Sequence, residues 1–507
     1  MNIQQAKEEI RNTLRAYLQK DPDGGYCYPA IRQRPLLLMG PPGVGKTAIV
    51  RQAAREMGLP LVAYTMTHHT RQSAVGLPLI QQRDYCGKAF SITEYTMSEI
   101  IGSVYRAMEE TGKQEGILFL DEINCVSETL APTMLQFLQN KTFGNHALPE
   151  GWAIIGAGNP PEYNKSVRAF DVVTLDRVRS LWVEADVQAF LDYGSGAGVH
   201  GAVLSYLRLK PERFYHVRRK ENSVEYVTAR GWEDLSRLLQ SYGTLEIPVT
   251  ESVVREFLCQ EDTSRDFYTY YCLYAKYGRD YAIREILNGQ IGEEAYTDRL
   301  KLARGGDFTE RFLVTNLVLE QLCRYGRAYQ AQDGLTVGLH EAVKSVLRQN
   351  ITLEDYLEAR RKALETKVRF QLLSGRALGE EKRVLNRLDA WNLSARENRC
   401  YDREKQEAFL RERFQQELKL RQQRIEETKS ALSAAIAFLL ECFGDGQELT
   451  LLLTGISASG ELMDYIGRHG CPAYTRLGER LLCQKEEARL REECLAAVSA
   501  AEERKNG

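Results

Sequence analysis

The sequence predicts an α/β fold with a parallel sheet around a phosphate-binding loop, followed by a helical lid and a long, mostly α-helical C-terminal extension. Three observations support this prediction. A glycine-rich loop lies between an apolar run and a helical pattern, two further apolar runs end in polar side chains, and the periodicity changes from strand-like to helix-like after about residue 190. A chain of 507 residues has room for about two to four domains.

The glycine-rich loop is a complete G-x-x-x-x-G-K-[ST] motif. It follows residues 36–39, which have the pattern of a buried strand, and precedes a helical pattern that ends at Gly58. In such a loop the backbone N–H groups and the helix N-terminus hold polyphosphate. We expect Lys46 to neutralise the β- and γ-phosphates and the Thr47 hydroxyl to bind Mg²⁺. A strand-to-helix turn without a ligand is the alternative. The motif consists of Gly40, Pro41, Pro42, Gly43, Val44, Gly45, Lys46 and Thr47.

A second apolar run, residues 116–120, ends in Asp121 and Glu122. A continuous apolar run of this length suits a parallel strand that is covered on both faces. Its carboxyl end then emerges at the same sheet edge as the phosphate loop. Asp121 is expected to hold Mg²⁺ through water, and Glu122 to polarise the attacking water as a base. Adjacent acids after a strand can also cap a helix, but the phosphate loop favours the catalytic interpretation.

A third apolar run, residues 152–158, is followed by Asn159 and Pro160. An amide one strand away from Asp121 and Glu122 can hydrogen-bond both a γ-phosphate and an attacking water. An asparagine before proline is also a common turn pair. The order of phosphate loop, acidic strand end and asparagine strand end favours the catalytic role.

These segments resemble the motifs of AAA+ ATPases, and most closely those of the MoxR-type branch. Residues 40–47, 118–122, 157–160 and 175–177 are similar to the Walker A, Walker B, sensor 1 and arginine-finger regions, and residues 228–232 to sensor 2 of the lid. The resemblance covers roughly residues 1–245. It implies an ATPase that uses ATP and Mg²⁺ and forms a ring, usually a hexamer, with sites between subunits. It also implies remodelling or assembly of protein clients, often with a von Willebrand factor A-domain partner.

The resemblance assigns two arginines. Arg177 would reach into a neighbouring subunit's site and stabilise charge on the transferring phosphoryl group, and Arg230 would contact nucleotide from the lid of the same chain. Arg168 and Arg179 lie close to Arg177 in the sequence and remain alternatives for the finger. Any of the three could instead be a surface charge or part of an interface salt bridge.

Two insertions are consistent with the branch assignment. Residues 76–95 consist of two β-like runs around a turn at 84–88, followed by a helix near Met97 for which Thr96 and Glu99 would form a capping box. Residues 141–149 have the pattern of a short hairpin.

In related rings such loops face the central pore and touch the client. Tyr85, Phe90 and Phe143 are therefore candidate client contacts. Ordinary hairpin packing explains the same residues equally well.

The composition excludes several classes of protein. Lys and Arg total 67 against 69 Asp and Glu, so the formal net charge of −2 argues against a chain that coats nucleic acid. No apolar stretch approaches the ~18 residues of a membrane helix. The N-terminus has the pattern of an amphipathic helix and not of a signal peptide. The 11 cysteines form no C-x-x-C pair, which suits reduced thiols in the cytoplasm. The adjacent His68 and His69 share no face, so no metal besides Mg²⁺ is expected.

We expect four regions: a nucleotide-binding core (1–190), a helical lid with sensor 2 (191–247), a helical domain (248–350) and a charged helical extension with a helical hairpin (351–507). Glycine breaks are predicted within the third region. In the fourth, residues 449–454 are consistent with a strand or a helix, and a final helix is expected from about Thr475 to Ala501. The predicted breaks are at Gly278, Gly289, Gly305-Gly306 and Gly326.

The sequence thus predicts an ATP-hydrolysing, ring-forming remodelling or assembly chaperone for proteins. A nucleic-acid-stimulated motor or loader is the alternative, and steep salt dependence with stimulation by DNA or RNA would identify it. A nucleotide-gated scaffold would instead bind ATP tightly and release almost no phosphate.

Overall fold

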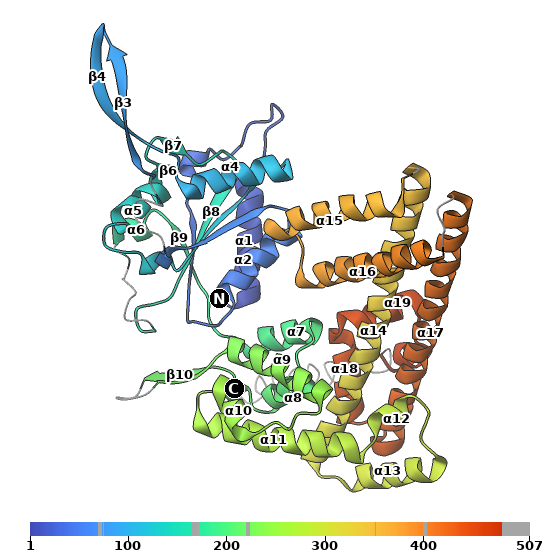
Figure 1. The fold of residues 1–507 in the computed structure, drawn as a ribbon. Coiled ribbons are helices and arrows are strands. Elements are labelled where there is room, and N and C mark those ends of the chain that lie inside the picture. Colours follow the sequence, from blue (N-terminus) through green and yellow to red (C-terminus); the bar gives the residue numbers. More distant parts are fainter. Residues whose placement is uncertain are drawn as a thin grey trace, which may run out of the picture. The chain divides into compact units, whose positions relative to one another are not determined.

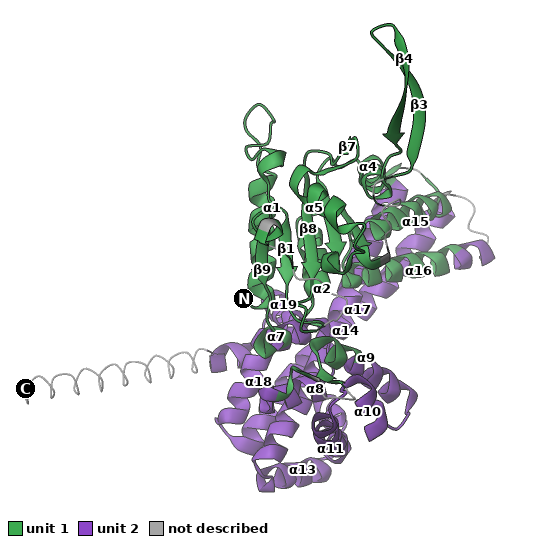
Figure 2. Cartoon of the chain, turned by 90° about the vertical axis from the view of Figure 1, so that its left-hand side faces the viewer, with its two compact units in different colours: residues 1–190, 213–234, 348–392 green, residues 191–212, 235–347, 393–507 purple. Residues whose placement is uncertain are grey.

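The computed structural model describes residues 1–68, 74, 76–163, 170, 172–219, 224–349, 351–398 and 403–478. The chain forms two compact units that interleave along the sequence (Figure 2). Unit 1 comprises residues 1–190, 213–234 and 348–392, and unit 2 comprises residues 191–212, 235–347 and 393–507. Segments far apart in the chain therefore share one core.

Unit 1 contains a five-stranded parallel sheet, of which Figure 1 labels β8 and β9. The strand order is β2-β5-β8-β1-β9. Every residue of β1 and β8 is buried, which explains their continuous apolar runs. The predicted parallel α/β core is confirmed. The strands are β1 (Leu36–Met39), β2 (Leu61–Thr65), β5 (Gly116–Asp121), β8 (Trp152–Gly158) and β9 (Arg179–Trp182).

Helices cover both faces of this sheet. Alternate residues of β1 belong to two different apolar clusters, because successive side chains of a strand point to opposite faces. Leu36 and Leu38 pack with helices α1 and α2, whereas Leu37 and Met39 pack with α4 and α5. These helices are α1 (Ile3–Tyr17), α2 (Lys46–Glu56), α4 (Glu99–Thr111) and α5 (Ala131–Asn140), and the short α6 (Val172–Leu175) precedes β9.

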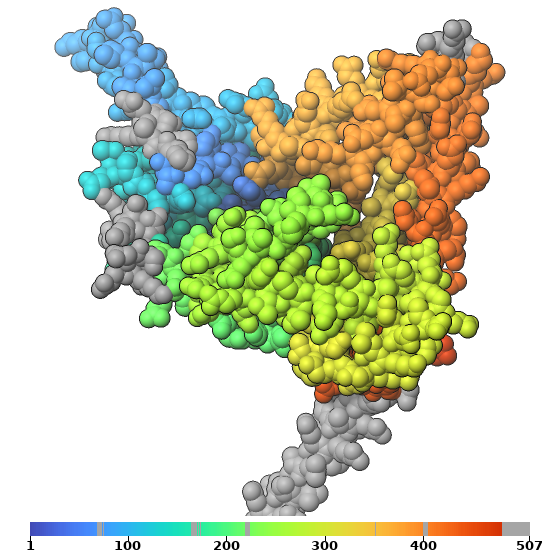
Figure 3. All heavy atoms as spheres, turned by 60° about the horizontal axis from the view of Figure 1, so that its bottom comes forward, coloured from blue at the N-terminus to red at the C-terminus, as the bar shows by residue number. Residues whose placement is uncertain are grey.

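The predicted ribbon is present between β2 and α4. Strands β3 (Pro78–Tyr85) and β4 (Lys88–Tyr95) pair antiparallel around Cys86 and Gly87. Both turn residues have positive φ (51° and 77°), the conformation that a tight two-residue hairpin needs. The ribbon projects from the rest of unit 1 (Figure 3).

The predicted capping box of α4 is wrong. The Ser98 side chain caps the helix by accepting a hydrogen bond from the Ile100 N–H. The Thr96 hydroxyl instead accepts from the Leu77 N–H, 2.9 Å away, at the base of the ribbon. The Thr96 side chain therefore closes the base of the ribbon, although the local sequence pattern predicts that it caps the helix.

The second predicted hairpin is also present, as β6 (Thr142–Phe143) and β7 (His146–Ala147). Phe143 is fully buried and stacks on Phe137 with ring centroids 3.9 Å apart. The prediction that Phe143 contacts a client is therefore wrong for this structure, because its side chain belongs to the core.

Two later segments complete unit 1. Strands β10 (His216–Arg219) and β11 (Val224–Val227) pair antiparallel as a further hairpin. Helices α15 (Leu353–Arg369) and α16 (Gly375–Glu397) form a helical hairpin. Two ion pairs join its helices, Arg360 with Glu381 at 2.9 Å and Arg361 with Asp389 at 2.6 Å.

Unit 2 is helical, with α14 and α17 as its longest helices. Its cluster of buried residues includes side chains from α12, α14, α17, α18 and α19. No helix of the described residues has both the length and the apolar character needed to span a membrane. Its helices, with α7 and α9 shared by both units, are α7 (Val187–Ala197), α8 (Gly201–Leu209), α9 (Ala229–Leu245), α10 (Glu251–Phe257), α11 (Glu261–Asp280), α12 (Ile283–Leu287), α13 (Glu293–Gly305), α14 (Phe308–Gln349), α17 (Arg403–Phe443), α18 (Gln447–Ala458) and α19 (Gly460–His469).

Two of the predicted glycine breaks are wrong, since α11 continues through Gly278 and α14 through Gly326. A Cβ on Gly326 would lie 3.0 Å from the Leu462 side chain, so this glycine lets α19 approach α14 closely. Residues 449–454 are helical, within α18. The final helix predicted from Thr475 falls mostly outside the described residues.

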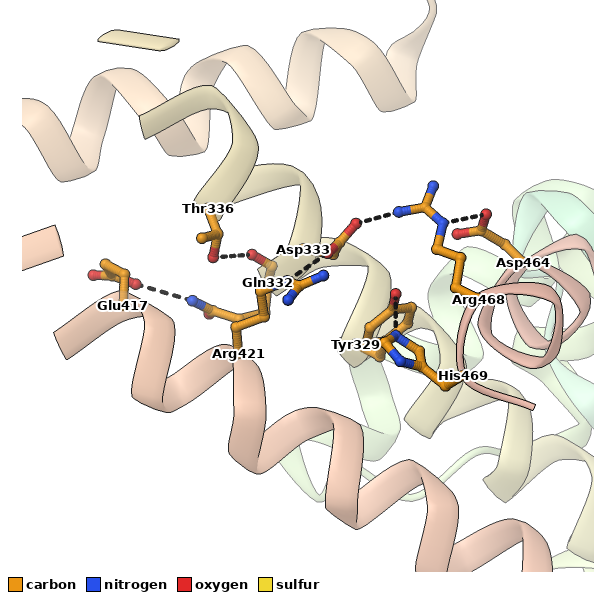
Figure 4. Close-up of polar contacts among 9 residues, drawn as sticks. All are labelled: Tyr329, Gln332, Asp333, Thr336, Glu417, Arg421, Asp464, Arg468 and His469. Carbon is orange, nitrogen blue, oxygen red and sulfur yellow. Dashed lines mark hydrogen bonds and ion pairs between the residues drawn. The ribbon is translucent and has the colours of Figure 1, made fainter. Parts of the chain in front are cut away.

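A buried carboxylate joins three helices of unit 2 (Figure 4). Asp333 of α14 is 6% exposed and accepts from Arg421 of α17 at 2.6 Å and from Arg468 of α19 at 2.7 Å. Nearby, Gln332 donates to Glu417 at 2.9 Å. Two guanidinium groups thus share one buried carboxylate, so replacing Asp333 would remove the acceptor that ties α17 and α19 to α14.

Candidate functional site

The phosphate loop lies between β1 and α2, as the sequence predicts. Gly45, the residue before α2, has φ +99°, which a residue with a side chain rarely adopts. This turn starts α2 at Lys46 and directs its first N–H groups toward the loop. The structure therefore forms the backbone cradle that the motif implies.

The Lys46 side chain lies within the loop. It is 9% exposed, and its ammonium group donates to Gly40 O at 2.8 Å, Pro41 O at 2.9 Å and Asn159 Oδ1 at 2.8 Å. The pKa of Lys46 is lowered to about 8, chiefly by burial, with Asp121 opposing this shift and Arg230 adding to it. A buried cation surrounded by oxygen atoms is suited to accept an anion in their place.

Thr47 and Asp121 are brought together at the carboxyl end of β5. The Thr47 hydroxyl donates to Asp121 Oδ2 at 2.7 Å, and the other carboxylate oxygen accepts from the Glu122 N–H at 3.0 Å. A hydroxyl and a carboxylate are the hard oxygen ligands that Mg²⁺ prefers. The side chains present therefore fit a magnesium ion, as the sequence predicts.

Glu122 has a left-handed backbone, with φ 54°. A non-glycine residue in this conformation is strained by about 1–3 kcal/mol, and such residues concentrate at functional sites. Its carboxylate accepts from the Thr67 hydroxyl at 3.1 Å. Sequence reasoning missed Thr67. The position of Thr67 just after β2 could have indicated its role, because β2 is the neighbour of β5 in the sheet.

Asn159 lies one strand away from Asp121, where β8 ends. Its side chain accepts from Lys46, and its backbone carbonyl accepts from Asn124 Nδ2 at 2.7 Å. Asn124 is 3% exposed, and a Cβ on Gly158 would lie 2.6 Å from its Oδ1 atom. Asn124, which the sequence analysis also missed, therefore fixes the strand end that carries Asn159.

The segment 213–234 contacts the phosphate loop. The Tyr215 hydroxyl donates to Pro42 O at 3.0 Å, and the Arg230 N–H donates to Gly43 O at 3.3 Å. The Thr228 side chain packs against Gly43, 2.8 Å from where a Cβ would be. The backbone of Arg230 is thus hydrogen-bonded to the loop, and its side chain is exposed. Tyr215 and Thr228 are further contacts that the sequence did not reveal.

The structure separates the candidates for the arginine finger. Arg179 of β9 donates to Thr13 Oγ1 at 2.9 Å and Glu9 Oε1 at 2.5 Å, and therefore anchors α1 to the sheet. Arg177 is half-buried between α6 and β9. Among the described residues, no hydrogen bond or ion pair joins its side chain to the Lys46 and Asp121 cluster. Arg168 lies outside the described residues.

The chain is similar to known proteins over part of its length. Residues 35–178 match the family model of an AAA domain of the dynein-related subfamily. A segment of 118 residues is 30% identical to Lon protease of Fusobacterium nucleatum, and this match covers 22% of the chain and 14% of that protein. The chain therefore spans about a seventh of that relative's length.

A solved structure, a mutant of RuvB from Thermotoga maritima, is 14% identical in sequence, with a TM-score of 0.27, and the match covers 50% of this chain and 69% of that one.

The family match spans the phosphate loop, β5 with Asp121 and Glu122, and β8 with Asn159. Residues 35–178, which we call the AAA domain after this match, therefore contain every predicted site residue except Arg230.

Proposed function

We propose that this protein is a Mg²⁺-dependent ATPase of the MoxR-like branch that forms a ring and remodels or assembles partner proteins in the cytoplasm. One observation carries the proposal. Lys46 contacts Asn159, and Thr47 contacts Asp121, so the phosphate loop meets the ends of β8 and β5 at one point. The sequence supplied these four residues from separate motifs, and hydrolysis of a nucleotide needs all of them in one place.

Each residue has a separate role in this proposal. Lys46 and the loop N–H groups bind the polyphosphate, and Thr47 and Asp121 would hold Mg²⁺. The ion, when bound, neutralises charge on phosphate oxygens. Glu122, oriented by Thr67, accepts a proton from the attacking water, and Asn159 orients that water. Arg230 contacts the nucleotide from the lid segment.

The client, the ring and the partner protein are each proposed on a separate ground. Tyr85 and Phe90 on the β3–β4 ribbon are 51% and 49% exposed, with ring centroids 6.3 Å apart, so they form an exposed aromatic pair that a client could contact. AAA+ domains generally assemble into rings, and a homo-hexamer is the proposed state. A von Willebrand factor A-domain partner follows from the family resemblance alone.

Phosphate release from ATP, with and without Mg²⁺, tests the proposed activity. Release that requires Mg²⁺ and is stimulated by a captured protein supports the remodelling function. Tight ATP binding without release would instead indicate a nucleotide-gated scaffold. Stimulation by DNA or RNA with a steep salt dependence would indicate the nucleic-acid motor.

The finger role of Arg177 can be tested by mixing subunits. Arg177→Ala alone should lower turnover by at least about 100-fold, because an arginine finger contributes about 10³–10⁵ to the rate of phosphoryl transfer. Mixing it with Lys46→Ala subunits, whose own Arg177 is intact, should restore part of the activity, measured as phosphate release per intact site. Arg179→Ala is the matched control, since Arg179 is bonded within its own chain and should not be rescued in this way. A mixture with no recovery would point to Arg168 or to a monomeric enzyme.

The pKa of Lys46 predicts how ATP affinity depends on pH. Below pH 8 the free protein already carries the charged lysine, so this group should leave affinity unchanged. Above its pKa of about 8 the free protein holds Lys46 neutral, and binding must take up a proton. Affinity should then fall by up to about tenfold per pH unit. Calorimetric titration in buffers of different ionisation enthalpy should show almost no proton uptake at pH 7 and nearly one proton at pH 9. Equal uptake at both values would contradict the prediction.

A further inference from the structure

The turn of the α15–α16 hairpin, residues 369–372, reaches the AAA domain although it lies about 190 residues beyond it in the chain. We call this turn the tip. Phe370 is 5% exposed and belongs to the same apolar cluster as Val62 and Met66. Leu372 packs against that cluster as well. Two ion pairs lie within the hairpin that presents the tip, and neither involves a residue of the tip.

The tip contacts strand β2 through the backbone. Among the described strands, β2 is an edge strand that pairs with β5 alone, so one side of it has N–H groups that the sheet does not use. The Leu61 N–H on that side donates to Phe370 O at 3.3 Å. The tip therefore bonds to β2 at the open edge of that strand, and the Phe370 side chain packs in the apolar cluster on one face of the sheet.

The tip also contacts helix α4. Arg369 Nη1 donates to both carboxylate oxygens of Glu110, at 2.6 and 2.8 Å. Its guanidinium group lies 5.6 Å from the centroid of the Phe370 ring. One short segment thus bonds the last turn of α4 and the first residue of β2.

Strand β2 leads to the proposed nucleotide site, and helix α4 follows the ribbon in the chain. β2 continues into Thr67, whose hydroxyl holds the Glu122 carboxylate. α4 begins at Glu99, four residues after the ribbon strand β4 ends at Tyr95. The tip is therefore bonded to the strand that leads to Glu122 and to the helix that follows the ribbon.

We propose that the tip is a positioning element that sets β2, and through Thr67 the Glu122 carboxylate, and so couples the nucleotide site to the helical extension. The link to nucleotide rests on the proposed ATPase function. The link between Arg369 and β2 does not, and can be tested without nucleotide. The proposal differs from packing alone, which predicts no dependence of the tip on nucleotide.

Arg369→Ala in the full-length protein tests the proposal, with Arg361→Ala as the matched control. The two arginines lie on the same helix, each forms a 2.6 Å ion pair, and their side chains are 52% and 55% exposed. The Arg361 pair stays within the hairpin, whereas the Arg369 pair joins it to α4. Arg369→Lys keeps the charge and should behave like the wild type.

The first readout is hydrogen exchange of the Leu61 amide without nucleotide. We expect Arg369→Ala to speed this exchange about two- to fivefold, as loss of a partly exposed ion pair would. Arg361→Ala should leave it unchanged. The same exchange rate in Arg369→Ala and the wild type would overturn the proposal, whatever the protein's activity.

The second readout is the response to nucleotide. Addition of ATP to the Glu122→Gln protein should slow exchange at Leu61 by about two- to fivefold, and Arg369→Ala should abolish that response. Arg369→Ala should also lower kcat by a similar factor with KM unchanged, and Arg369→Lys should restore it. A wild-type protein that hydrolyses ATP without any change at Leu61 would refute the coupling alone. A wild-type protein that neither binds nor hydrolyses ATP would refute the proposed function and with it the coupling.

Discussion

Lys46→Ala should weaken ATP binding by about 100-fold or more, because each hydrogen bond to a charged group contributes about 1.5–3 kcal/mol and an ammonium group can donate several. In the free protein the lysine already bonds to three oxygen atoms of the loop and of Asn159. ATP would replace these neutral partners with phosphate oxygens, which gain far more from the buried charge. Titration with a fluorescent ATP analogue measures the loss.

A second buried lysine provides a matched control for this experiment. Lys141 is 7% exposed, and burial lowers its pKa to about 8, as it does for Lys46. Its ammonium group has a single hydrogen bond among the described residues, to Gln33 Oε1 at 3.4 Å. Lys141→Ala should therefore change stability but leave ATP affinity as in the wild type. Equal affinities for Lys46→Ala and the wild type would remove the phosphate-loop assignment.

Glu122→Gln should bind ATP and fail to hydrolyse it. General-base catalysis contributes about 10²–10⁴-fold, so turnover should fall by at least about 100-fold. Glutamine keeps an oxygen that can accept from Thr67, and the carboxylate of Asp121 stays next to Thr47. Binding and assembly should therefore survive while proton acceptance is lost.

Single-turnover phosphate release measures the expected loss of hydrolysis. ATP retained on gel filtration measures the binding that should remain. The ATP-bound variant is also the form with which to capture the client from a cell extract, since it should not release its partner by hydrolysis. Asp192→Asn, which likewise replaces a carboxylate with the amide of the same length, is a suitable control because Asp192 belongs to unit 2, outside the AAA domain. Normal turnover in Glu122→Gln would refute the role of this residue as the base.

Local sequence patterns determined the core of the fold and the site. Buried parallel strands must be apolar throughout, and the loop residues obey a strict spacing, so β1, β5, β8 and the Lys46 loop could be located without a structure. Thr47 and Asp121 were predicted to meet because the carboxyl ends of parallel strands share one edge. In the structure the Thr47 hydroxyl and the Asp121 carboxylate lie 2.7 Å apart.

The missed features depend on contacts between distant segments. Thr67, Asn124 and Tyr215 act on the site through partners that belong to other elements, and of the three only Thr67 has a local signal, its position just after β2. Ser98 caps α4 because Thr96 is used by Leu77, and Gly326 marks a close helix contact where local sequence suggests a break. Propensity describes what a segment prefers alone, and tertiary contacts decide between its alternatives.

The interleaving of the two units has a consequence for synthesis. Unit 1 takes residues 348–392 from late in the chain, so its β2 edge and apolar cluster are incomplete while residues 235–347 are being made. At a translation rate of about 5–20 residues per second, the ribosome needs several seconds to supply the missing segment. During that interval the nascent AAA domain presents an unpaired strand edge, the kind of surface that chaperones protect and that aggregation exploits.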